Sequence, residues 1–389
     1  MKKLIRTATV SLSLDILLKG QLKFLSQNFY VVAVSGQDEH LNEVAKRENI
    51  KTIAVTFERK ISPFKDFVSL IKLYRVLKKE KPFIIHSITP KAGLLSMIAG
   101  YFAKVPVRIH TFTGLVFPTQ TGLLKRLLIA MDKLLCKFAT HIYPEGNGVK
   151  NDLLNYKITK KPLKIIANGN VNGIDCDYFK PNHFSETTKQ SLKAELKIEY
   201  DDFVFIFVGR LVKDKGINEL MTAFVRFSET SKHAKLLLVG PFEQHLNPIN
   251  EITLKQIKTN KNIISVGYQN DVRPYYAISN CLVFPSHREG FPNVVLQAGA
   301  MNLPSIVTNI NGSNEIITDN ENGIIIEVKN ENAIFDGLNF MINEKDIFEK
   351  FKNNARNRIV TNFEQKIVWE AVLKEYKNIE NDYQNLKSV

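Results

Sequence analysis

The chain has 389 residues, of which 44% are hydrophobic and 24% charged, a composition typical of a globular protein with about two domains that excludes a disordered or fibrous one. Lys and Arg number 53 against 39 Asp and Glu, so the net charge of +14 favours an anionic partner such as a phosphorylated substrate, an acidic lipid or a nucleic acid. Nucleic acid is the weakest of the three, because the sequence has no zinc-finger spacing and no RNA-binding aromatic motif.

Short apolar runs alternate with helical periodicity from end to end, which predicts parallel sheets built from β-α-β units. The strands expected in the first half are 4–10, 30–35, 51–57, 83–88, 107–112, 141–144 and 163–167. Those expected in the second half are 203–209, 235–240, 263–267, 281–285, 305–308 and 323–328. The polar stretch 175–191 breaks the alternation and is the expected linker. The prediction is therefore an α/β protein with two Rossmann-like, doubly wound domains, 1–178 and 179–389, facing a central crevice.

Three expected helices are amphipathic. The stretch 121–137 places one apolar face between basic side chains; the face is Leu124, Leu127, Leu128, Met131, Leu135 and Phe138, and the flanks are Lys125, Arg126, Lys133 and Lys137. Such a face either packs in the core, the commoner case, or lies on an anionic membrane, and the basic helix at 64–79 would join it there. The last helix, about 366–389, carries the only Trp and must bury one face.

The N-terminus and the cysteines favour the cytoplasm. The basic residues 1–6 are not followed by a long apolar stretch, so we expect a first strand there rather than a secretory leader. No apolar run is long enough to span a membrane. Cys136, Cys176 and Cys281 form no metal or disulfide spacing, which suits a reducing compartment.

The most informative stretch is 281–300. An apolar run ending at Pro285 predicts a buried strand, a polar loop with Glu289 and Gly290 follows, and a helix begins near Pro292. A loop between a parallel strand and a helix N-terminus is where open α/β sheets hold phosphorylated ligands. Gln297, about two helical turns after Glu289, could face the same crevice, so that one side chain holds a sugar and the other a ribose.

Two cations follow an earlier strand of the second domain. Gly209 and Arg210 end the expected strand, and Lys215 comes five positions after Arg210. Arg and Lys stabilise the negative charge that develops on a leaving diphosphate. The alternative is a solvated basic turn. This alternative is less favoured because the Glu289 loop follows in the order that a diphosphate-binding site needs.

Two strand ends of the first domain carry histidines. We expect His86, inside its strand, to be a satisfied core histidine. His110 lies beside Thr111, Thr113 and Gly114, a polar strand end where a neutral imidazole could bond a sugar hydroxyl.

These segments, in this order, resemble the retaining bacterial glycosyltransferases of the GT-B fold (family 4 type, "glycosyl transferases group 1") that build surface polysaccharides. The resemblance covers nearly the whole chain and implies that the first domain binds the acceptor, the second binds a nucleotide-sugar, and the last helix crosses back to the first domain. The catalytic residues it implies are His110, Glu289, Arg210 and Lys215. The donor-binding residues are Gly209, Arg210, Lys215, Tyr268, Glu289, Gly290, Phe291, Pro292, Asn293 and Gln297; the acceptor-side residues are Lys91, Thr111 and Thr113. The sequence departs from the family at Gln297, where the family has a second Glu.

The resemblance also implies the reaction. A hexosyl or N-acetylhexosaminyl group would pass with retention from a nucleotide-sugar, in the first place a UDP-sugar, to a polyprenyl-diphosphate-linked acceptor in capsule, O-antigen or exopolysaccharide synthesis. The enzyme would be peripheral on the inner face of the cytoplasmic membrane. We expect no cofactor and no metal, because Arg210 and Lys215 would do the metal's work and Asp175-Cys176-Asp177, a possible metal motif, lies in the linker.

Two alternatives stay open. A UDP-sugar 2-epimerase can use the same fold, but it needs several carboxylates and histidines in the crevice, and His110 with Glu289 is a sparse set. A non-catalytic, basic membrane- or polymer-binding protein is conceivable because Gln297 replaces the family's carboxylate.

Overall fold

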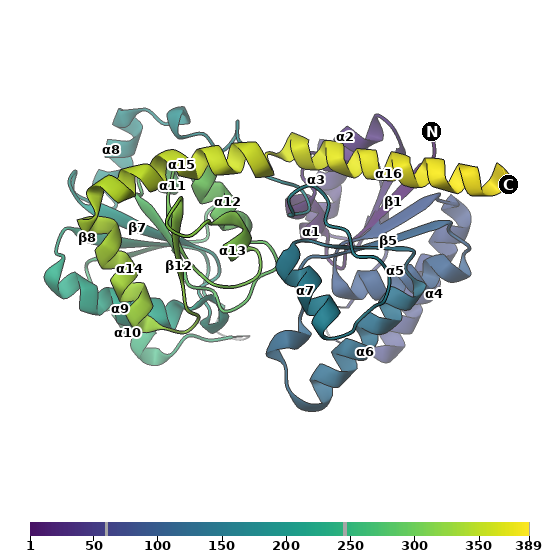
Figure 1. Ribbon diagram of the computed structural model, residues 1–389, viewed down its shortest axis with the longest axis horizontal. Coiled ribbons are helices and arrows are strands. Elements are labelled where there is room, and N and C mark those ends of the chain that lie inside the picture. Colours follow the sequence, from purple (N-terminus) through teal and green to yellow (C-terminus); the bar gives the residue numbers. More distant parts are fainter. Residues whose placement is uncertain (59–60, 244–246, 389) are drawn as a thin grey trace. The chain divides into compact units, whose positions relative to one another are not determined.

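The computed structural model describes residues 1–58, 61–243 and 247–388. The chain divides into two compact units (Figure 1). The first unit is Met1–Gly173 together with Gln365–Val389, and the second is Ile174–Glu364.

The first unit is a parallel sheet of six strands covered on both faces. The strands are β1 (Lys3–Thr7), β2 (Tyr30–Ser35), β3 (Lys51–Ala54), β4 (Ile84–Ser87), β5 (Val107–Phe112) and β6 (His141–Pro144), in the order β3-β2-β1-β4-β5-β6. The helices are α1 (Ser11–Leu17), α2 (Gln21–Ser26), α3 (Glu39–Glu48), α4 (Pro63–Glu80), α5 (Pro90–Phe102), α6 (Gly122–Phe138), α7 (Asn147–Asn155) and α16 (Gln365–Ser388). Because side chains alternate along a strand, Leu4 enters the core beneath α1, α2, α3 and α16, whereas Ile5 enters the core beneath α4 to α7.

The second unit repeats this arrangement. Its strands are β7 (Phe203–Val208), β8 (Ala234–Val239), β9 (Ile263–Gly267), β10 (Cys281–Phe284), β11 (Ser305–Thr308) and β12 (Gly323–Ile326), in the order β12-β11-β10-β7-β8-β9. Its helices are α8 (Glu186–Glu195), α9 (Ile217–Thr230), α10 (Glu251–Thr259), α11 (Arg273–Ala277), α12 (Asn293–Ala300), α13 (Ser313–Ile316), α14 (Glu331–Asn343) and α15 (Lys345–Phe363). Both sheets have the strand order of the dinucleotide-binding fold, so the predicted pair of doubly wound domains is confirmed.

Helix α16 belongs to the first unit, as the family resemblance implied for the last helix (Figure 1). Its apolar face is buried in the core with α1 and α2; the buried residues are Val368, Val372, Tyr376 and Ile379. The Trp369 ring lies against Gly20, and its indole N–H donates to Asn172 Oδ1 at 2.8 Å. The single Trp therefore helps to hold α16 against the rest of the first unit.

Two details differ from the sequence prediction. The stretch 163–167 is not a strand: Leu163 makes one isolated bridge to Ile142, and the positive φ of Ala167 ends the extended backbone. The expected linker 175–191 contains the start of α8, whose N-cap Ser185 accepts from the backbone of Thr188, and the units divide earlier, after Gly173.

Helix α6 buries only part of its apolar face. Leu135 and Cys136 are buried, but Leu123, Leu124, Leu127 and Leu134 expose 82%, 45%, 47% and 40% of their surface. Among the described residues, no helix is long and apolar enough to cross a membrane. Part of the face thus packs in the core, as such a face more often does, and the exposed leucines lie at the surface.

Candidate functional site

In the second unit, two loops meet at the ends of the neighbouring strands β7 and β10. Gly216, at φ +71°, begins α9 so close to the β10 loop that a Cβ there would lie 2.0 Å from the carbonyl oxygen of Pro285. The amide of His287 donates to the carbonyl of Asp214 at 2.8 Å. Only glycine permits this approach, which brings the side chains of the two loops together.

Lys215 and Glu289 form an ion pair across these loops. Ser286 Oγ donates to the same carboxylate oxygen, Glu289 Oε1, at 2.7 Å. Both charged side chains are mostly buried, at 18% and 15% exposure, which strengthens their interaction relative to a surface pair. The structure thus joins two residues that the sequence predicted for one site, a cation and a carboxylate at a strand's carboxyl end.

Arg210 is held differently. Its side chain is 53% exposed, and Nη1 donates to Glu243 Oε2 at 2.6 Å. Gly209, at φ +148°, sits where β7 ends, and its carbonyl lies 1.9 Å from where a Cβ of Gly240 would be. Arg210 is therefore on the predicted strand edge, yet the structure pairs it with Glu243 rather than bringing it onto Lys215 or Glu289.

The residues after Glu289 are half-buried or buried, and they pack closely against Gly312. Gly312, at φ +77°, would carry a Cβ 2.4 Å from the carbonyl oxygen of Gly290 and 2.9 Å from Pro292 Cδ. The Phe291 side chain is buried in the core with its ring 5.5 Å from that of Phe363, so its predicted contact with the donor cannot come from the ring. The sequence missed this because an aromatic residue after Gly is equally suited to a core or a ligand.

Three further residues that were predicted to bind the donor lie in the second unit. Asn293 begins α12 and is half-buried, and Gln297 lies one turn on. The hydroxyl of buried Tyr276 lies 3.2 Å from the carbonyl oxygen of Val294 and 3.3 Å from Gln297 Oε1, so the two acceptors share its single proton. Tyr268 follows β9 and is 70% exposed. Tyr276, which the sequence did not single out, thus contacts the residue that replaces the family's second Glu.

In the first unit both histidines are buried. The His110 ring lies against Gly93 of α5, and its Nδ1 bonds Ser87 Oγ at 2.8 Å. Burial lowers the pKa of His110 to about 3, so the imidazole is neutral. Because His110 is only 1% exposed, the structure does not place it at an open polar strand end as the sequence suggested. Its role beside a sugar stays a prediction.

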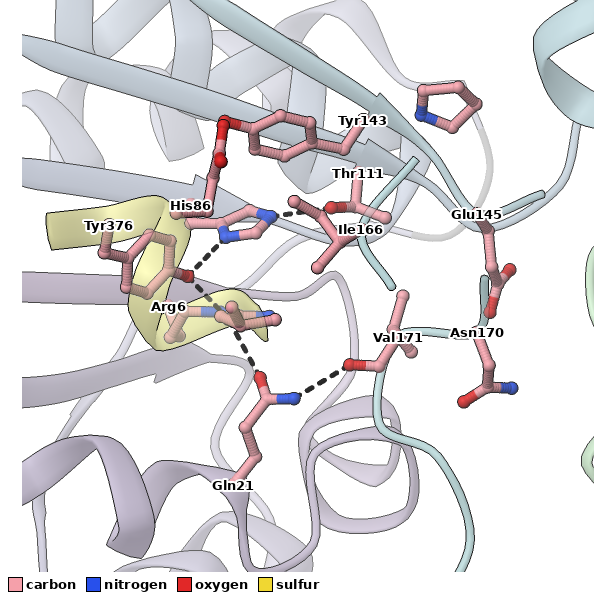
Figure 2. A pocket seen from close by; sticks show the side chains of 13 residues that line it. Arg6, Gln21, His86, Thr111, Tyr143, Glu145, Ile166, Asn170, Val171 and Tyr376 are labelled. Atoms are coloured by element: carbon pink, nitrogen blue, oxygen red, sulfur yellow. Dashed lines mark hydrogen bonds between the residues drawn. The ribbon is translucent and has the colours of Figure 1, made fainter. Parts of the chain in front are cut away.

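His86 is the satisfied core histidine that the sequence predicted. Arg6 Nη1 donates to the hydroxyl oxygen of Tyr376 at 2.9 Å, so the Tyr376 proton goes to His86 Nδ1, 2.6 Å away. His86 Nε2 then donates to Thr111 Oγ1 at 2.7 Å. Burial and the nearby Arg6 charge lower the pKa of His86, which keeps the ring neutral. This chain of bonds links α16 to three strands (Figure 2).

A small cavity adjoins this chain (Figure 2). Its free volume of about 20 Å³ is enough for roughly one water. Polar groups from several elements line it; they include Arg6, Gln21, Thr111, Glu145 and Asn170. One signal for it is visible in the sequence, an Arg inside the strand at 3–7, but the partner Tyr376 lies 370 positions away.

The three residues predicted for the acceptor side do not lie together at one place in the first unit. Thr111 is buried and bonded to His86 on the α16 side of the sheet. Thr113 Oγ1 donates to the carbonyl of Ile88 at 2.9 Å. Lys91, at the start of α5, donates to both carboxylate oxygens of Asp66 at 2.8 and 3.0 Å. Lys91 faces the larger cavity described below rather than the Thr111 side.

Within the described residues no group of three or more His, Cys, Asp or Glu side chains is arranged to hold a metal ion. Asp175 Oδ1 instead accepts from the backbone amides of Asp177 and Tyr178 at 3.1 and 2.8 Å, a local turn.

Comparison with known proteins identifies the family. Residues 188–358 match the model for "Glycosyl transferases group 1", and residues 11–145 match "Glycosyl transferase 4-like". The chain is 32% identical over 377 residues to the capsular polysaccharide biosynthesis glycosyltransferase CapM of Staphylococcus aureus, covering 95% of this chain and 96% of the relative. The chain belongs to the group 1 glycosyltransferases. The predicted family is therefore confirmed.

Other relatives of this glycosyltransferase agree. It is 31% identical over 319 residues to a UDP-Gal:alpha-D-GlcNAc-diphosphoundecaprenol alpha-1,3-galactosyltransferase of Escherichia coli, covering 79% of this chain and 78% of the relative. A solved glycosyltransferase from Rickettsia africae superposes with a TM-score of 0.79 at 22% identity, covering 97% of this chain and 98% of that one. Anabaena Alr3699/HepE in complex with UDP superposes with a TM-score of 0.81 at 15% identity, covering 97% and 100%. These likenesses confirm the GT-B fold.

Proposed function

We propose that this glycosyltransferase transfers a hexosyl or N-acetylhexosaminyl group from a UDP-sugar, with retention, to a polyprenyl-diphosphate-linked saccharide in capsule, O-antigen or exopolysaccharide synthesis. The buried Lys215–Glu289 pair is the observation that carries the proposal. Two relatives over most of the chain support it, since one is named for capsule synthesis and the other for UDP-Gal and a diphosphoundecaprenol acceptor.

The chemistry follows from the charges at the strand ends. The donor diphosphate would leave with developing negative charge, which Lys215 would stabilise, with Arg210 as a second cation at the edge of β7. Glu289, already fixed by Ser286 Oγ, would accept hydrogen bonds from the hydroxyls of the transferred sugar. Same-face attack on the anomeric carbon needs no protein nucleophile, because the leaving diphosphate oxygen can take the acceptor proton. Gln297 would bond the ribose.

The surface of the first unit suits an acidic membrane on the cytoplasmic side. Exposed leucines of α6 lie between basic side chains, and Phe64 and Phe67 of α4 expose 79% and 61% of their surface. Apolar residues that insert at the membrane interface and cations near anionic headgroups both strengthen membrane binding. This arrangement supports peripheral binding at the membrane that carries a lipid-linked acceptor.

The test is transfer of labelled sugar from UDP-sugars to a saccharide-diphosphate-undecaprenol acceptor. Lys215→Ala is expected to lower kcat at least a hundredfold, since the leaving charge loses its buried cation. Arg210→Ala should lower it less, because Arg210 is half exposed. Lys213→Ala, an exposed lysine in the same turn, is the matched control and should change little. Near-normal rates in Lys215→Ala would refute the assignment.

The same assay separates the two alternatives. Interconversion of the UDP-sugar without an acceptor would indicate an epimerase. Binding of vesicles with neither reaction, across a panel of donors, would indicate a non-catalytic protein. Labelled lipid product supports the transferase.

A further inference from the structure

The first unit contains a second, larger cavity, with a volume of about 350 Å³. This is within the range of small-molecule binding pockets. It lies at the carboxyl end of the sheet, where the chain leaves β1, β4 and β5, and α6 forms one wall. In α/β folds, ligands bind at this end of the strands.

The walls of the cavity are mainly apolar; they include Leu94, Phe112, Leu115, Leu128 and Met131. Two of its polar groups already bond one another, since Thr9 Oγ1 and Thr89 Oγ1 are 2.8 Å apart. A third, Lys91, is paired with Asp66. A ligand with many hydroxyls would leave most of them unpaired against these walls, which costs free energy for each group. The cavity therefore suits an apolar ligand.

An apolar track leads from the cavity to the surface. Ile61 and Val116 line the cavity and are also 46% and 39% exposed. On α6, exposed Leu124 precedes wall residue Leu128 by one turn, and exposed Leu127 precedes Met131 by one turn. Residues four apart on a helix are neighbours, so apolar surface continues from inside the cavity to the outer face of α6.

Charge is distributed to suit a ligand with one anionic end. Of the described residues that line the cavity, the one cation, Lys91, is already paired with Asp66, and Asp132 adds a carboxyl, so a diphosphate would gain little inside it. Arg126 lies outside it on the exposed side of α6, and Lys125 is two turns from Asp132 on the same helix. A diphosphate would therefore be held outside, with an attached apolar chain inside.

We propose that this cavity binds the isoprenoid chain of the lipid-linked acceptor, at the units next to its diphosphate. The proposal rests on the proposed function, which supplies an acceptor of this class. Partial withdrawal of the lipid from the bilayer would fix the distance between the membrane and the reacting sugar. The rival occupant, the acceptor saccharide itself, is an outcome of the test.

The experiment uses the full chain and one saccharide diphosphate attached to one, two or three isoprene units, in solution without membranes. The acceptor KM is expected to fall at least tenfold from one unit to three, because each added unit buries apolar surface. Met131→Gln should abolish most of this gain and leave the Kd of UDP unchanged. Leu134→Gln, on an exposed position of the same helix that does not line the cavity, is the matched control.

Each possible result either supports or overturns the proposal. A KM that does not depend on chain length, or a Met131→Gln effect equal for all three acceptors, would overturn the proposal and favour the saccharide. If no acceptor is glycosylated, the proposed function fails separately, and calorimetry with farnesyl diphosphate then tests the cavity alone. Binding that Met131→Gln weakens tenfold and Leu134→Gln does not would support the cavity site. Absence of binding, or equal loss in both variants, would overturn it.

Discussion

Asp132 offers a measurement of the larger cavity that does not depend on enzymatic activity. Burial raises the pKa of this carboxyl from 3.8 to about 7. The raised value means that ionisation is harder in the folded chain than in the unfolded one. Between about pH 4 and pH 7 the folded state therefore holds a proton that the unfolded state has lost, and stability falls as pH rises through this window. Above about pH 7 the penalty is complete and constant.

Replacing Asp132 by Asn removes the ionisable group and therefore the penalty. One pKa unit corresponds to about 1.4 kcal/mol, so the change from 3.8 to about 7 sets an upper bound of about 4 kcal/mol. The side chain keeps some exposure to solvent, so we expect on the order of 2 kcal/mol. The Asn variant should match the wild type near pH 4 and exceed its free energy of unfolding by this amount at pH 8.

The assay is denaturant unfolding followed by tryptophan fluorescence. The chain has one Trp, Trp369, and its ring is packed in the first unit, so the signal reports the unit that contains Asp132. Asp382→Asn, at an exposed position of the same unit, is the control for the exchange of Asp for Asn itself. A difference between Asp132→Asn and the wild type that is the same at pH 4 and pH 8 would refute the burial of this carboxyl.

Two further predictions concern the donor site. Gln297→Leu should weaken UDP binding about fivefold, or on the order of 1 kcal/mol, through the loss of one hydrogen bond, whereas Gln297→Glu should preserve or tighten it; calorimetry decides, and an unchanged Kd in the Leu variant would mean that Gln297 serves only Tyr276. Transfer should persist in EDTA, because Lys215 and Arg210 supply the positive charge at the diphosphate; complete loss of turnover that magnesium or manganese restores would contradict this account.

The order of the elements was readable from the sequence because two simple periodicities carry it. Alternating apolar runs gave the strands of both sheets, and the Gly209 and Glu289 loops fell at strand ends as parallel sheets require. The prediction of a strand at 163–167 was wrong, because the positive φ at Ala167 depends on packing that composition does not encode.

The candidate site was less predictable, since a strand's two faces look alike in sequence. His86 and His110 both occupy apolar strands, and nothing local says that one ring meets Thr111 and Tyr376 while the other lies beneath Gly93. Likewise, the motif of Phe291 fits a ligand contact, whereas the ring packs on Phe363. Such choices are made by distant segments, and these pairings only exist once the chain has folded.

The place of α16 in the first unit has a consequence for synthesis on the ribosome. The second unit is one continuous segment, Ile174–Glu364, so all of its residues are synthesised before those of α16. The first unit, although synthesised earlier, must wait for Val368, Val372 and Tyr376 to cover its core and to give buried Arg6 its hydroxyl partner. The half of the enzyme that is made first is thus the half that is finished last, and a chain cut short after Glu364 would leave its nascent N-terminal half with an uncovered apolar face for chaperones to recognise.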